Sequence, residues 1–101
     1  MSGALARARA YGVAVRFADL GDWGSVELRS EYDPRLPEIR LNVRVAEALP
    51  VELLGEFVAH AVGHELYHHR ERIGEVPPID DRRAREAAAD KFARALADGD
   101  A

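Results

Sequence analysis

The chain has 101 residues, of which 48% are hydrophobic and 32% are charged, with no cysteine and a formal net charge of -4. This length and composition predict one soluble domain over residues 1–101 and exclude global disorder, while the lack of cysteine excludes disulfides and thiolate metal sites. The acidic balance argues against direct binding of nucleic acid or an anionic membrane, and the lack of a signal peptide or membrane span makes the cytoplasm the expected location.

The first half of the chain is predicted to form a helix and two strands. Residues 2–11 form the helix, which Gly12 ends. Residues 13–17 have strand propensity. After a turn at residues 21–24, residues 25–32 alternate between apolar and polar side chains, which predicts a half-buried strand.

The second half is predicted to form a third strand and two longer helices. Residues 33–37 contain two prolines that cannot donate to a ladder, so they connect the second strand to a third at residues 39–44 in a hairpin. Apolar residues then recur at helical spacing from about residue 50 to about residue 72. A last helix follows from an N-cap at Asp80 or Asp81 to about residue 98.

These elements predict an α+β domain with a small three-stranded, mostly antiparallel sheet. An N-terminal helix precedes the sheet and two helices follow it. Nothing in the alternation of side chains indicates an internal repeat.

All four histidines lie between positions 60 and 69. His64 and His68 are four residues apart, so on a helix they are neighbours on one face and can bind one zinc ion. Glu65 lies about 100° around the helix from His64, beside such a metal, where it can act as a base towards water. The alternative is a polar surface helix in which this H-E-x-x-H pattern occurs by chance.

The last helix carries two carboxylates on an otherwise small and apolar face. Glu86 and Asp90 share this face with Ala89 and Ala93. A carboxylate buried without a partner is costly, so zinc is the expected partner of Glu86, and Asp90 could accept the free N–H of a ligating histidine. Three protein ligands would leave a position for water, as in catalytic sites. The alternative is that both carboxylates are solvated and pair with nearby arginines.

Four stretches of the chain resemble the ImmA/IrrE family of zinc metallopeptidases, which are gluzincins. The stretches are Tyr11–Val15, Ile39–Asn42, His64–His69 and Glu86–Ala93. The resemblance implies a zincin-like fold in which His64, His68 and Glu86 bind one Zn²⁺ and Glu65 is the catalytic base.

The chain departs from the family pattern at three positions. Ala88 stands where a Glu is usual, Asp90 where an Asn is usual, and Tyr67 where a Gly is common. The size and the E-x-x-x-D spacing also resemble minimal gluzincins.

The expected activity is that of a zinc endopeptidase which hydrolyses peptide bonds of a protein or peptide substrate. The resemblance implies a regulatory protein, such as a helix-turn-helix regulator, as that substrate. One alternative is a non-catalytic zinc-binding module that binds such a partner. Another is a latent protease in which residues 98–101 or the Pro77-Pro78 loop block the zinc.

Several other residues are weaker candidates. His60 lies one turn before His64 and could be an extra ligand, a substrate contact or a proton donor, although a hydrogen-bonded helix histidine is the commoner case. His69 points elsewhere and is expected to pack. Trp23 is expected to anchor a turn or to contact substrate. Core packing is the expected role of the tyrosines, with stabilisation of an oxyanion as the alternative; they are Tyr11, Tyr32 and Tyr67.

The hairpin is a candidate for substrate binding. In zincin-like folds an exposed edge strand binds substrate by β-augmentation, and residues 38–43 precede the histidine helix. The alternative is an edge that is merely covered or charged.

Overall fold

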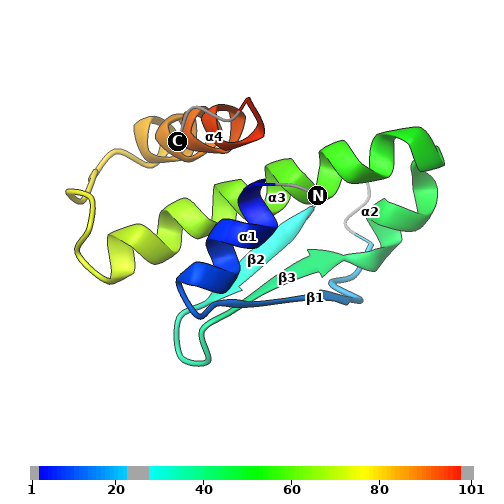
Figure 1. Ribbon diagram of the computed structural model, residues 1–101, viewed down its shortest axis with the longest axis horizontal. Helices are drawn as coiled ribbons and strands as arrows, with labels where there is room; N and C mark the ends of the chain where they lie inside the picture. The colour runs from blue at the N-terminus through cyan, green and yellow to red at the C-terminus, as the bar shows by residue number, and fades with distance from the viewer. Residues whose placement is uncertain (1–2, 23–27, 99–101) are drawn as a thin grey trace.

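The computed structural model describes residues 3–22 and 28–98. The elements in chain order are α1 (Gly3–Ala10), β1 (Ala14–Ala18), β2 (Ser30–Asp33), β3 (Glu38–Asn42), α2 (Val43–Ala48), α3 (Val51–Arg72) and α4 (Arg82–Ala97). Helix α3 lies between the sheet and α4, and α1 packs beside it on the same face of the sheet (Figure 1). The predicted α+β class is confirmed. Within the described ranges, no helix combines the length and apolar character that crossing a membrane requires.

The three-stranded sheet is mixed, with the order β1-β3-β2. Strands β2 and β3 form the predicted antiparallel hairpin, whereas β1 runs parallel to β3. The prediction of a mostly antiparallel sheet was therefore wrong for the β1–β3 pair. The physical reason is topological: the segment after β1 leads into β2 at the same end of the sheet, and the hairpin then inserts β3 between them. Side-chain alternation within a strand carries no information on this order.

The second predicted strand is shorter than expected. Strand β2 begins at Ser30, so Leu28 and Arg29 precede it, and residues 25–27 lie outside the described residues, as does Trp23. Tyr32 pairs with Ile39 across the hairpin.

The third predicted strand ends earlier than expected, because Asn42 starts a helix. Its side-chain oxygen accepts a hydrogen bond from the backbone N–H of Arg44, which caps α2. Val43 and Val45 have high strand propensity, but the cap satisfies the free N–H groups of a helix start and prevails. The Asn42 side chain is buried and also donates to the carbonyl oxygens of Gly21 and Leu28.

The core lies between β3 and α3. Ile39 and Leu41 of β3 are fully buried, as are Val62 and Leu66 of α3. Helix α1 adds two buried alanines, Ala4 and Ala8. The chain turns after this helix at Gly12, whose φ of 73° only glycine adopts readily. The predicted bounds of α1, α3 and α4 agree with the structure to within one or two residues.

Small residues let α3 and α4 pack closely. A Cβ atom at Gly63 of α3 would lie 2.8 Å from the Cα atom of Ala93 in α4, closer than real contacts allow. Ala89 and Ala93 are fully buried against α3. This close approach brings the polar side chains of one helix within reach of those of the other.

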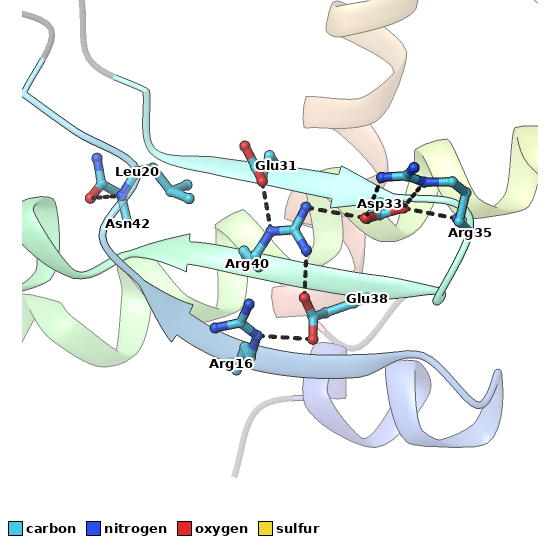
Figure 2. A network of polar contacts seen from close by, with 8 residues as sticks. All are labelled: Arg16, Leu20, Glu31, Asp33, Arg35, Glu38, Arg40 and Asn42. Carbon is cyan, nitrogen blue, oxygen red and sulfur yellow. Dashed lines mark hydrogen bonds and ion pairs between the residues drawn. The ribbon is translucent and has the colours of Figure 1, made fainter.

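The outer face of the sheet carries a ladder of ion pairs (Figure 2). Arg40 of β3 contacts Glu31 at 2.6 Å, Glu38 at 2.6 Å and Asp33 at 3.4 Å. Arg16 of β1 contacts the other oxygen of Glu38 at 2.9 Å. Charges of both signs thus cover the face of the sheet opposite the core.

Candidate metal centre

Three side chains predicted as metal ligands converge between α3 and α4. Nε2 of His64 lies 3.1 Å from Oε1 of Glu86, and Nε2 of His68 lies 3.2 Å from Oε2 of the same carboxylate. The three donor atoms lie within 4.8 Å of one another, a group that could hold a metal ion. Zinc binds nitrogen and oxygen at about 2.0–2.2 Å, which places the ligands of a tetrahedron about 3.3 Å apart. The observed separations fit that spacing.

The opposite ring nitrogens are also held by carboxylates. Nδ1 of His64 lies 2.8 Å from Oδ1 of Asp90, as expected for a residue that accepts the free N–H of a ligand. Nδ1 of His68 lies 2.9 Å from Oε1 of Glu71. Glu71 was not among the predicted site residues, although its position three residues after His68 on the same helix places it within reach. Both rings are therefore oriented with Nε2 towards Glu86.

The electrostatics of the centre favour positive charge. Burial lowers the pKa of His64, but the hydrogen bond to Asp90 and the charges of Glu65 and Glu86 outweigh burial, so its pKa is raised. Burial raises the pKa of Asp90, but its bonds to His64 and His60 prevail and the pKa is lowered. A divalent cation would supply the positive charge that these carboxylates favour. The donor set therefore fits such an ion chemically as well as geometrically.

Glu65 is buried and oriented by the sheet. Its side chain is 7% exposed, and its Oε2 accepts a hydrogen bond of 2.6 Å from the hydroxyl of Ser30 in β2. The role of Ser30 was also missed, because a partner 35 residues away leaves no signal in local spacing. Glu65 is placed beside the donors without being among them.

Two pockets meet at Glu65. The first has a volume of about 380 Å³ and includes Ser30, Phe57, His60 and Glu86 in its lining. The second is lined by residues that include His68, Tyr32, Pro78 and Ile79. Glu65 is therefore reached from two pockets, one next to His64 and Glu86 and one next to His68.

The strand that borders these pockets is β2. Strand β3 is central, because β1 and β2 pair with its two sides. Residues 38–42 themselves are therefore not the exposed edge. The other half of the predicted hairpin, β2, is the edge strand, and it supplies Ser30 and Tyr32 to the pocket linings.

The remaining candidates fall into two groups. His60 joins the centre, since its Nε2 lies 3.2 Å from Oδ1 of Asp90. His69 is buried in packing, with Nδ1 2.6 Å from the hydroxyl of Tyr32 and its ring edge-on to Tyr11. Tyr67 packs against Phe92.

Comparison of the chain with protein-family models, with curated proteins and with solved structures finds no match. The resemblance to the ImmA/IrrE family therefore stays a prediction, and the functional argument depends on the geometry of the centre.

Proposed function

We propose that this chain is a zinc-dependent endopeptidase of the gluzincin type, with zinc held by His64, His68 and Glu86. The observation that carries the proposal is the convergence of two Nε2 atoms on one carboxylate, with Glu65 beside them on the wall shared by both pockets. Imidazole nitrogen with carboxylate oxygen is a donor set that suits zinc, and three protein ligands are typical of catalytic zinc sites. Zinc at this position would supply a Lewis acid that polarises a peptide carbonyl and lowers the pKa of water to about 7.

Glu65 is the general base of the proposed reaction. Ser30 orients its carboxylate through a hydrogen bond to Oε2, and one carboxylate oxygen takes the proton of the attacking water. The same oxygen then returns the proton to the nitrogen of the leaving amine. Burial of Glu65 and its fixed orientation support this role, because proton transfer requires a carboxylate held within hydrogen-bond reach of the reacting water.

Chain residues around the donors orient and shelter the site. Asp90 and Glu71 each hold Nδ1 of one histidine, which fixes the ring and directs Nε2 towards the metal position. The side chains of His64 and His68 are 18% and 17% exposed, so the protein shields most of both rings from solvent.

The two pockets support cleavage within a chain rather than at its end. Because Glu65 lines both pockets, substrate residues before and after the scissile bond would each have a pocket beside it. The edge strand β2 offers backbone groups with which an extended peptide can pair. We therefore propose that the cleaved segment is an unfolded or loop segment of a protein substrate. On the resemblance described above, a helix-turn-helix regulator is our specific candidate.

One observation favours the alternative, a latent or non-catalytic zinc module. Pro78 and Ile79 of the loop before α4 line the pocket next to His68, so this loop borders the route to the donors. The other segment suggested as a block, residues 98–101, falls for the most part beyond the described residues. In this alternative the chain binds zinc and a partner protein without hydrolysis.

The deciding experiment combines zinc analysis with proteolysis. The wild type and Glu65→Gln would be loaded with zinc, their metal content measured, and each incubated with a denatured protein pool whose new N-termini are then counted. We expect one tightly bound zinc in both proteins and cleavage by the wild type alone. A wild type without stoichiometric zinc would disprove the proposal, whereas equal inertness of two zinc-loaded proteins would favour the non-catalytic module.

A further inference from the structure

The arrangement of donors in the metal centre recurs one helical turn away. His60 and His64 have the same four-residue spacing on α3 as His64 and His68, and Asp90 follows Glu86 by four residues on α4. The helices run in opposite directions (Figure 1), so a step of one turn back along α3 meets a step of one turn forward along α4. The second group therefore consists of two histidines and one carboxylate, like the first.

The distances within this second group are those of a potential ligand set. Nε2 of His60 lies 3.2 Å and Nδ1 of His64 2.8 Å from the same oxygen, Oδ1 of Asp90. Donor atoms of the three residues lie within 4.8 Å of one another. The rings of His60 and His64 are 6.4 Å apart between centroids.

We propose that His60, His64 and Asp90 form a second, weaker site for a divalent transition metal such as Zn²⁺. Two imidazoles and a carboxylate suit zinc, cobalt and nickel rather than calcium or magnesium, which prefer oxygen ligands alone. The site is weaker because His60 and Asp90 are 41% and 42% exposed, so water competes for the ion.

The two sites share His64 through opposite nitrogens. Nε2 of His64 faces Glu86 and belongs to the first site, whereas Nδ1 faces Asp90 and belongs to the second. A neutral imidazole offers one lone pair to a metal, and its other nitrogen carries a proton. Metal in the second site also takes Asp90 from its hydrogen bond with His64. With the first site occupied, a second ion can bind Nδ1 of His64 only if that proton is released to water or if Nε2 leaves the first ion. Occupation of the second site therefore weakens the first, and by linkage the first weakens the second to the same degree.

A consequence for activity rests on the proposed function. His60, His64 and Asp90 all line the first pocket, so a metal ion there would occupy space that a substrate needs. Zinc in excess of one equivalent would then inhibit peptide hydrolysis. The binding of the second ion itself does not depend on hydrolysis.

The test is a titration of the metal-free full chain with Zn²⁺, followed by equilibrium dialysis and by ¹⁵N chemical shifts of the histidine rings. The wild type should bind one equivalent tightly and a second at least about tenfold more weakly, with the His60 signals changing only during the second. His60→Asn should retain the tight equivalent and lose the second. Asp90→Asn should lose the second and also weaken the first.

The variant His68→Asn tests the two metal sites separately, because His68 belongs to the first site alone. This variant should lose the tight equivalent but keep the weaker one, because His60, His64 and Asp90 remain. A wild type that binds only one zinc at millimolar free metal, or a second equivalent that survives His60→Asn, would overturn the inference. A wild type with no tight equivalent but a His60-dependent weak one would instead overturn the proposed function and leave this inference standing.

Discussion

Ser30 of β2 donates a hydrogen bond of 2.6 Å from its hydroxyl to Oε2 of Glu65 in α3. This bond links the edge strand to the helix that carries the metal donors. It also fixes the orientation of the Glu65 carboxylate. The sheet therefore contributes to the proposed chemistry although none of the proposed metal ligands lies on it.

Removal of this bond should lower activity without a loss of metal. A hydrogen bond to a charged group contributes about 1.5–3 kcal/mol, so Ser30→Ala should reduce kcat/KM by about 10- to 100-fold. Ser30→Thr, which keeps the hydroxyl and suits a strand, is the matched control. Peptide cleavage and zinc content would be measured on both variants. Wild-type kcat/KM in Ser30→Ala would show that Glu65 needs no such support.

Glu71 should contribute to metal affinity through His68. Its carboxylate holds Nδ1 of His68 at 2.9 Å, and partners of this kind typically account for 10- to 100-fold in affinity. Glu71→Ala should weaken zinc binding by about that factor, measured in competition with a chromophoric chelator. Glu52→Ala, at an exposed site in the first turn of the same helix, should leave the affinity unchanged. Equal affinities of the two variants would contradict this role for Glu71.

Replacement of two glycines of α3 by alanine should change the free energy of unfolding in opposite directions. Alanine at Gly55, where an added Cβ meets nothing within 4 Å, should stabilise the helix by about 0.5–1 kcal/mol. Alanine at Gly63 would place its Cβ 2.8 Å from the backbone of Ala93, and the overpacking should cost about 1–3 kcal/mol. Urea denaturation of the metal-free chains would measure both. Because Gly63→Ala also pushes α4 away, it should weaken zinc binding, whereas Gly55→Ala should not.

Zinc bound between α3 and α4 should stabilise the folded chain. A ligand at 100 times its Kd stabilises the folded state by about 2.7 kcal/mol, which for a chain of this size raises Tm by about 10–20 °C. Thermal unfolding followed by circular dichroism should show this rise, and a chelator should reverse it. Glu86→Ala should abolish most of the shift, while Glu65→Gln should preserve it. An equal shift in Glu86→Ala would remove Glu86 from the ligand set.

The ladder on the outer face of the sheet should make stability depend on pH. Hydrogen bonds from Arg16 and Arg40 lower the pKa of Glu38 below 4.5, and hydrogen bonds from Arg35 lower that of Asp33 below 3.8. The folded chain therefore binds fewer protons than the unfolded chain in this range. The stabilisation of the folded chain by these ion pairs is present at neutral pH and is lost as the pH falls through the lowered pKa values of Glu38 and Asp33.

Arg40→Gln should accordingly reduce the loss of stability between about pH 6 and about pH 3. Arg83→Gln, on an exposed part of α4, is the control and should behave like the wild type. Urea midpoints at several pH values would be compared. The same pH dependence in Arg40→Gln and the wild type would show that the ladder contributes little to folding.

The long helices and the donor residues followed from local sequence patterns. The spacing of His64 and His68, and of Glu86 and Asp90, placed each pair on one helix face, and the structure brings those faces together. Glu71 was within reach of the same reasoning, since a residue three positions after a ligand lies on the same face.

Other features depend on contacts that a local pattern does not contain. The Ser30–Glu65 bond joins residues 35 positions apart, and the parallel direction of β1 depends on where the hairpin inserts. Helix α2 was missed because the strand propensity of Val43 and Val45 opposes the cap at Asn42, and only the burial of Asn42 decides between them.

The candidate metal ligands and the sheet lie in separate parts of the chain, which affects how its function can change in evolution. All candidate donors lie between His60 and Asp90, on α3 and α4, whereas the sheet supplies Ser30 and an edge for peptide pairing. Substitutions in the hairpin could therefore abolish turnover while metal retention persists. If the chain hydrolyses peptides as proposed, relatives that have lost hydrolysis but still hold metal would need few changes, and a gene duplication would yield a catalytic copy and a metal-binding copy from one scaffold.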